Sequence, residues 1–290
     1  MTTATPTPPG AARSAMRHMV KNFYDLQRLR IQSGGRKRAK HIELSQADID
    51  YYENVEGSFR KLEKYQLTEI RRRVKAHPLW AAFLEGVKGC GETMSGVILS
   101  EIDIHACDTV SRLWNFAGLG VWDVGELSCG HEGYRIKHHE VVKDGNGNAK
   151  RDEEDKLVTV QKIEWRCPKC GTRKDLVKDL NRKAAMKRVA GVRLPYNAHL
   201  RTKLLGVLGG CMLKASGVSD DPGYAKFFYD YRNRLKSEGW GKSDGHRKNA
   251  AIRYMVKMFL LDLYKEWRTL EGLPVREPYA EEYLGKRHAV

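Results

Sequence analysis

Two short cysteine and histidine motifs constrain the fold of this chain more than any other feature of its sequence. Cys129-Gly130-His131 and Cys167-Pro168-Lys169-Cys170 each place two soft ligands on a tight turn, so that neighbouring side chains take two corners of a tetrahedron. Between the turns lie two runs rich in strand-forming residues, 134–142 and 157–165, separated by a Gly- and Asn-rich segment. A turn, a β-hairpin and a second turn are typical of a zinc ribbon.

The four residues Cys129, His131, Cys167 and Cys170 are therefore predicted to bind one structural Zn²⁺, because four protein ligands leave no open position for a catalytic water. His138 and His139 are alternative ligands, which we place instead at exposed positions of the hairpin. The chain shows no export signal, so metal binding is favoured over disulfides. The remaining cysteines lie in apolar helical surroundings and are predicted to be core: Cys90, Cys107 and Cys211.

The stretch 87–120 is predicted to organise the rest of the chain. Val87-Lys88-Gly89-Cys90-Gly91 indicates a tight turn, because glycine takes positive φ without steric cost. We expect a helix to follow, capped by Thr93. This helix-hairpin-helix pattern presents backbone N–H groups that can hold a nucleic-acid phosphate, with Lys88 adding charge. A glycine turn between two core helices is the other interpretation of the same residues.

The net charge of +16 indicates a polyanionic partner, and the charge is clustered. Residues 1–40 hold nine Lys or Arg against one acid, and residues 178–203 hold eight against one. Neither segment has a wide apolar helical face, so nucleic acid is favoured over a membrane surface. The predicted nucleic-acid contacts are Lys88, Gly89, Gly91, Thr93, Arg182, Lys183, Lys187, Arg188, Arg193, Asn197, His199, Arg201, Lys203, Arg247 and Lys248.

Most of the remaining chain has helical patterning. Residues 1–41 are predicted to be a basic arm, disordered until it meets nucleic acid, with a short helix at 19–31; an ordinary solvated tail is equally compatible. Ser45 is expected to cap a long helix with heptad spacing, a helical arm or half of a coiled coil. His77-Pro78 breaks this helix. Such an arm permits a homodimer.

Four helices are expected after the ribbon. The first is a basic helix over 180–191, and the second is an apolar helix over 204–213, whose N-terminal polar residues suit a phosphate. A third helix starts at Asp221-Pro222 and ends at Gly239-Trp240-Gly241. The last is a long amphipathic helix whose apolar stripe runs from Ile252 to Trp267.

Several segments in order carry a family resemblance. After the glycine turn come Leu113–Leu119, Leu200–Leu205, Phe228–Leu235 and His246–Arg253, followed by the final apolar helix. Over about residues 45–270 this order resembles the C-terminal domain of the DEDD insertion-sequence transposases, the recombinases guided by a bridge RNA. That domain is similar to the Nop domain of box C/D ribonucleoproteins, a relationship that also describes the Tas effectors of tandem interspaced guide RNA (TIGR) systems.

The departures from the family bear on catalysis. Such transposases carry an N-terminal RuvC-like nuclease with four carboxylates, whereas the first 40 residues here contain one acid, Asp25. The family's catalytic serine follows the Ala-Gly-Leu segment; the nearest candidate, Ser128, adjoins Cys129 and lacks the family's pattern. Residues 165–174 lack the arrangement of an HNH site. We therefore predict no catalytic residues, and the chain resembles a Tas protein without a nuclease.

The resemblance and the patterning together predict a mainly α fold: a helical arm and a helix-hairpin-helix, Nop-like domain with an inserted small β zinc ribbon. The expected parts are a basic arm (1–41), a helical arm (42–86), the first half of the Nop-like domain (87–124), the ribbon (125–175), the second half (176–270) and a tail (271–290).

The resemblance implies a guide-RNA-binding ribonucleoprotein protein whose partners are a structured guide RNA and a target DNA. The alternatives are a transposase-related DNA-binding or recombination protein of a mobile element, and a plain structure-binding protein with no guide. Because no run approaches 18 apolar residues and no secretory signal is apparent, we expect no membrane partner and a cytoplasmic or nucleoid location.

Overall fold

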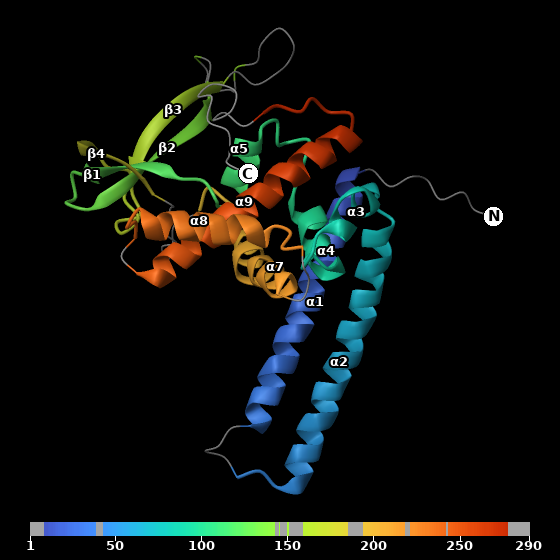
Figure 1. The fold of residues 1–290 in the computed structure, drawn as a ribbon. Helices are drawn as coiled ribbons and strands as arrows, with labels where there is room; N and C mark the ends of the chain where they lie inside the picture. The colour runs from blue at the N-terminus through green and yellow to red at the C-terminus, as the bar shows by residue number, and fades with distance from the viewer. Residues whose placement is uncertain are drawn as a thin grey trace. The chain divides into compact units, whose positions relative to one another are not determined.

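The computed structural model describes residues 9–38, 43–142, 145, 150, 159–184, 194–217, 221–241 and 243–277. The chain divides into a helical unit, Met1–Trp114 with His199–Val290, and a β unit, Asn115–Ala198. The predicted class is confirmed, because the fold is mainly helical with one small four-stranded antiparallel sheet (Figure 1). Among the described helices, none combines the length and the hydropathy needed to cross a membrane.

The helical elements follow the chain in this order: α1 (Pro9–Lys37), α2 (Gln46–Lys75), α3 (Pro78–Ala82), the 3-10 turn η1 (Leu84–Gly86), α4 (Glu92–Glu101), α5 (Val110–Phe116), α6 (Ala198–Thr202), the π-helical segment η2 (Lys203–Leu208), α7 (Gly209–Ser216), α8 (Ala225–Ser237) and α9 (Asp244–Leu270). The predicted apolar helix over 204–213 therefore lies in a continuous helical stretch, with η2 as a wider turn inside it.

The first helix corrects the prediction of a disordered basic arm. Residues 9–37 form α1, which packs side by side with α2 and also contacts α4 (Figure 1). Its buried side chains Met16, Val20 and Phe23 recur at helical spacing and face those neighbours. Burial of these apolar side chains stabilises α1 despite the high positive charge that had favoured disorder. The rest of the predicted arm, residues 1–8 and 39–41, lies outside the described residues.

The second helix begins where the sequence predicts. Ser45 caps α2 through a capping box, in which its hydroxyl accepts from the Asp48 N–H while the Asp48 carboxylate accepts from the Ser45 N–H. The far end of α2 is the buried end, with Ile70 and Val74 fully enclosed, whereas Leu62 is 50% exposed. The predicted coiled-coil partner of α2 is therefore α1 of the same chain.

The core of the helical unit forms around α4 and α9. From Met94 to Glu101 every residue of α4 is buried, and Gly96 allows close approach because a Cβ there would lie 2.8 Å from Ile70 Cγ2. The predicted stripe on α9 is confirmed for its central residues, with Met255, Phe259 and Leu263 fully buried. Ser243 caps α9 by accepting from the His246 N–H.

The sheet of the β unit has the strand order β3-β2-β1-β4. Its strands are β1 (Trp122–Leu127), β2 (Glu132–Val141), β3 (Thr159–Arg166) and β4 (Leu176–Ala184). The predicted hairpin is confirmed as β2 and β3, which pair from Tyr134 with Arg166 to Val141 with Thr159. The sheet extends on both sides of the predicted 125–175 ribbon, since β1 begins at Trp122 and β4 ends at Ala184.

The strand β4 contradicts the basic helix predicted over 180–191. Residues 176–184 pair with β1, and Leu180 and Ala184 pack against a buried cluster that contains Val124 and Tyr134. Pairing with the open edge of β1 and burial on this cluster outweigh the helical propensity of the local sequence. Residues 185–191 of the predicted helix lie outside the described residues.

Candidate metal centre and candidate nucleic-acid contacts

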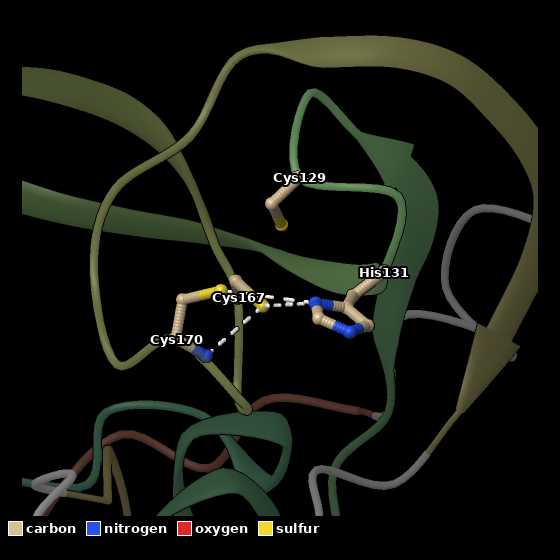
Figure 2. A group of neighbouring side chains, drawn as sticks. All are labelled: Cys129, His131, Cys167 and Cys170. Atoms are coloured by element: carbon tan, nitrogen blue, oxygen red, sulfur yellow. Dashed lines mark hydrogen bonds between the residues drawn. The ribbon is translucent and has the colours of Figure 1, made fainter.

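The two predicted ligand turns meet at one end of the sheet. Cys129 and His131 lie between β1 and β2, whereas Cys167 and Cys170 lie after β3. The four ligand atoms lie within 4.8 Å of one another, and Figure 2 shows the side chains converging from the two turns. All four predicted metal ligands are thus brought together, and the cysteines are free thiols.

The two turns are built alike. In the first, Gly130 N–H donates to the Leu127 carbonyl at 2.8 Å, and Leu127 N–H donates to the His131 carbonyl at 3.0 Å. In the second, Gly171 N–H donates to the Cys167 carbonyl at 2.9 Å, and Cys167 N–H donates to the Thr172 carbonyl at 3.1 Å. Each turn needs its glycine, because φ is +72° at Gly130 and +70° at Gly171.

The donor geometry fits a tetrahedral metal ion. His131 Nδ1 lies 3.7 Å from Cys170 Sγ and 3.8 Å from Cys167 Sγ, with the nitrogen directed at both sulfurs in Figure 2. A nitrogen and a sulfur bound to one zinc ion in tetrahedral geometry are about 3.6 Å apart. We therefore interpret these separations as the spacing of two ligands of one ion rather than as weak hydrogen bonds.

The thiols of this cluster change one another's pKa. Hydrogen bonding to the Cys167 and Cys129 thiols raises the pKa of Cys170 to about 11. Burial would raise the pKa of Cys167, but donation from the backbone N–H groups of Cys170 and Lys169 brings it below its ordinary value. The Cys170 N–H lies 3.3 Å from Cys167 Sγ. A cation at the centre would offset the crowding of sulfur charge.

The other residues that the sequence singled out in this region are Ser128, His138 and His139. Ser128, the nearest candidate for a catalytic serine, is exposed, and its N–H donates to the Asp175 carbonyl at 2.9 Å, tying the first turn to the segment before β4. His138 and His139 pair further along β2 with Lys162 and Gln161, and their side chains lie outside those described. Within the described part of the chain, the four-residue group is the one set close enough to hold a metal ion.

The glycine turn is confirmed, and its main contact is internal. Gly89 has φ of +84°, and a Cβ there would lie 2.6 Å from the Met212 nitrogen, so the turn packs directly on α7. Lys88 Nζ lies 2.8 Å from the Asp221 carboxylate. The expected Thr93 cap is wrong, because α4 begins at Glu92 with Gly91 as its N-cap residue and no side-chain cap.

The predicted contacts in the β unit are only partly described. Arg182 and Lys183 are exposed on β4, where they pair with Glu132 at 2.5 Å and Asp123 at 3.6 Å. Asn197 N–H donates to the Phe116 carbonyl at 2.8 Å. The other predicted contacts of this region lie outside the described residues: Lys187, Arg188 and Arg193.

Two predicted contacts in the helical unit gather around Tyr24 of α1, which the sequence did not single out. Lys203 Nζ lies 3.0 Å from the centre of the Tyr24 ring, and the His199 ring meets the same ring edge-on. Burial lowers the pKa of both Lys203 and His199. Arg201 is half-buried on α6.

The last two predicted contacts lie near the start of α9, where Lys248 is exposed and Arg247 is half-buried. They belong to a third basic stretch that the sequence interpretation missed. Residues 224–257 hold nine Lys or Arg against three acids, interleaved with aromatic residues. The charge count applied to the other segments would have found it.

The cysteines outside the metal centre follow the prediction in part. Cys90 and Cys107 are buried as expected, but Cys211 is exposed on α7, because the backbone of that residue, and not its thiol, faces the Gly89 turn. Comparison with known proteins adds no further assignment: no family model matches the chain, and no curated protein matches it.

Proposed function

We propose that this protein binds structured RNA through phosphate contacts and acts as the guide-RNA-binding protein of a ribonucleoprotein that targets DNA without cutting it. The observation that carries the proposal is the net charge of +16, concentrated in three stretches of the chain. A polyanion is the partner that such a surface attracts most strongly.

The contacts of α1 indicate which basic surfaces remain for this role. Arg30 pairs with Glu63 at 2.5 Å and Lys37 with Glu53 at 3.1 Å, so part of the charge of α1 is neutralised within the helical unit. By contrast, β4 and the α8–α9 pair carry exposed basic side chains, among them Lys178 and Lys248. Lys183 also keeps 66% of its side chain exposed, although it lies 3.6 Å from Asp123. These features favour β4 and α8–α9 over α1 as the phosphate-binding surfaces.

Zn²⁺ is the metal that best suits the Cys₃His set, since thiolate and imidazole ligands in a closed tetrahedral site are typical of structural zinc. The residues Cys129, His131, Cys167 and Cys170 would hold it, and its role would be to fix the two turns that end the sheet. It would thereby hold β4 and its basic side chains in place.

The choice of RNA over duplex DNA rests on the resemblance to Nop and Tas proteins and on the chemistry of RNA. Loops, bulges and 2′-hydroxyls offer contacts that duplex DNA lacks. A transposase-related DNA-binding protein and a binder of nucleic-acid structure without a guide are the alternatives that the experiment must separate.

The test compares the affinity of the full chain for its co-purified RNA and for a duplex DNA of equal charge at two salt concentrations. We expect tighter binding to the RNA at both, with a log–log salt slope of about one per phosphate neutralised. Equal affinities at each salt concentration would leave the DNA-binding alternative standing. Sequencing the co-purified RNA then separates a guide, which has a discrete family of sequences, from unrelated structured RNA.

A matched pair of variants locates the surface. Lys178→Gln with Lys183→Gln removes two exposed charges from β4, and Lys61→Gln with Lys64→Gln removes two exposed charges from α2. We expect the β4 variant to weaken RNA binding across many sequences and to lower the salt slope by about two, whereas the α2 variant should do neither.

A further inference from the structure

An indole is exposed in the turn between α8 and α9. Trp240 is 43% exposed, in contrast to the aromatic residues of the core, and it lies between Gly239 and Gly241, which have φ of +64° and +88°. The backbone N–H of Trp240 donates to the Leu235 carbonyl at 2.9 Å, and Arg247 Nη1 lies 3.5 Å from the backbone carbonyl of Trp240. The backbone therefore holds this exposed side chain in a defined place.

The Trp240 indole packs against a second ring. The His246 ring lies 4.8 Å from the Trp240 ring, centre to centre, with 34° between their planes. His246 is itself exposed, at the start of α9. A flat apolar ring that is backed by a neighbour and open to solvent offers a π-face for stacking.

Exposed basic side chains lie near the indole along the chain. Lys248 is exposed two residues after His246, and Lys236 is exposed in the last turn of α8. On the same two helices, Tyr231 stacks on Tyr254 with ring centres 4.4 Å apart, and the Arg234 guanidinium lies 4.7 Å from the Tyr231 ring. Aromatic and basic side chains thus alternate on α8 and α9, the combination that binds single-stranded nucleic acid.

Protein partners also use exposed tryptophan, but the cores of protein interfaces are depleted in charge. The stretch 224–257, with nine Lys or Arg against three acids, has the opposite composition. We propose that Trp240 stacks on an unpaired base of the bound RNA while Lys236 and Lys248 contact the neighbouring phosphates. This inference rests on the proposed RNA-binding function and deepens it, since it identifies unpaired nucleotides as the part that α8 and α9 read.

The test uses the full chain, with its metal centre loaded, and two probes: a short RNA without self-complementarity, and the duplex of that RNA with its complement. We expect Trp240→Ala to weaken single-strand binding by about tenfold and to leave the salt slope unchanged, because stacking releases no counterions. Lys248→Gln should instead lower the slope by about one. Duplex binding should change little in Trp240→Ala, since the paired bases are already stacked.

Two further variants complete the experiment. Trp240→Phe keeps a ring and should retain most of the affinity, while the quenching of tryptophan fluorescence by RNA should fall. This variant keeps the test valid if Trp240→Ala folds poorly. Tyr65→Ala removes an aromatic side chain that is 73% exposed on α2, and should leave binding to both probes unchanged.

The outcomes separate this inference from the proposed function. If the wild-type protein binds the single strand and Trp240→Ala binds it equally well, the stacking role is overturned and RNA binding stands. If the wild-type protein binds neither probe, both proposals fail. If Trp240→Ala keeps its RNA affinity but loses a protein that co-purifies with the wild type, the indole belongs to a protein interface.

Discussion

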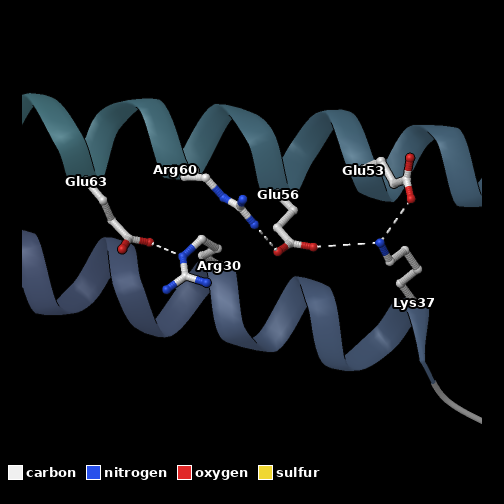
Figure 3. Close-up of polar contacts among 6 residues, drawn as sticks. All are labelled: Arg30, Lys37, Glu53, Glu56, Arg60 and Glu63. Carbon is white, nitrogen blue, oxygen red and sulfur yellow. Dashed lines mark hydrogen bonds and ion pairs between the residues drawn. The ribbon is translucent and has the colours of Figure 1, made fainter.

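The Arg30 guanidinium donates to the Glu63 carboxylate at 2.5 Å across the seam between α1 and α2 (Figure 3). Both side chains are mostly enclosed, with 25% of Arg30 and 11% of Glu63 exposed. Further along the seam, Lys37 Nζ lies 3.1 Å from Glu53 and 3.9 Å from Glu56. Arg30 and Lys37 of α1 therefore have a structural partner, the acidic face of α2, which limits what these two residues contribute to a surface for nucleic acid.

Glu63→Gln should destabilise the packing of α1 on α2. The change leaves the enclosed Arg30 charge without its carboxylate, which we expect to cost about 2 kcal/mol of the free energy of unfolding. The measurement is urea unfolding followed by circular dichroism. Glu53→Gln is the matched control on the same helix: its side chain is 58% exposed, so the loss should be about 0.5 kcal/mol or less. Equal losses in the two variants would mean that the enclosure of the Arg30 pair has no energetic consequence.

Gly89→Ala should destabilise the helical unit strongly. Its Cβ would lie 2.6 Å from the Met212 nitrogen and 2.7 Å from the Cys211 carbonyl carbon, at a φ of +84° that a side chain disfavours. Because backbone cannot move aside as a side chain can, we expect a loss of at least about 2 kcal/mol by thermal or urea unfolding.

Gly91→Ala is the matched control in the same turn. Gly91 has φ of −73°, and a Cβ there would meet nothing within 4 Å. The change should cost about 1 kcal/mol or less, the difference between glycine and alanine as N-cap residues. A Gly91→Ala variant less stable than Gly89→Ala would show that the contact with α7 is not what fixes glycine at position 89.

The features that the sequence predicted well are local ones. The Cys129 and Cys167 turns depend on residues a few positions apart, each with a glycine at its positive φ, so their spacing alone indicates the ligand set. The Ser45 cap and the α9 stripe are likewise encoded within one or two helical turns. These patterns were enough to predict a mainly helical fold with a small β insertion and the cluster of four residues that could hold a metal ion.

The larger errors arose where a distant partner decides the structure, whereas the Thr93 cap was a local error. The basic residues of α1 predict disorder until the acidic side chains of α2, such as Glu63, are placed beside them. The sequence of β4 favours a helix until the edge of β1 is available to pair with it. The Trp240 indole could not be separated from core aromatics by spacing, because its exposure depends on how α8 and α9 pack. The spacing of apolar residues along the sequence does not show how distant elements pack against one another.

The stability of the helical unit should fall below neutral pH through His77. Its Nδ1 accepts from the Leu79 N–H at 3.2 Å and caps α3, and its ring packs edge-on against Trp267. Burial lowers the pKa of His77 from 6.5, although Glu271 acts in the opposite direction. The folded state therefore binds this proton less readily than the unfolded state, so the contribution is complete above the unfolded pKa and is lost as the pH falls towards the folded one.

His77→Asn tests this directly, because asparagine can cap α3 without titrating. We expect the free energy of unfolding to change less between about pH 7.5 and about pH 5.5 in the variant than in the wild type. The part of the pH dependence that remains would belong to other groups, including His199, whose pKa is also lowered by burial. The same pH dependence in both proteins would exclude His77 as a contributor.

Cys170→Ser should remove the metal and loosen the end of the sheet. The four ligand atoms lie within 4.8 Å of one another and come from two turns that a bound ion would bridge. Binding of structural zinc contributes about 10–16 kcal/mol to the folding of small zinc-binding peptides. Loss of one thiolate ligand should remove most of that stabilisation from the β unit. Elemental analysis should find one zinc per wild-type chain and much less in the variant.

Hydrogen exchange shows which elements are destabilised when the metal is lost. We expect faster exchange in the strands β1 to β4 of Cys170→Ser, with the amides of α9 still protected, because the ligands belong to the β unit alone. Cys211→Ser is the matched control, since it removes an exposed cysteine from α7 and should leave both zinc content and exchange unchanged. Wild-type protein purified in the presence of zinc but without stoichiometric metal would contradict the assignment of these four residues as a zinc site.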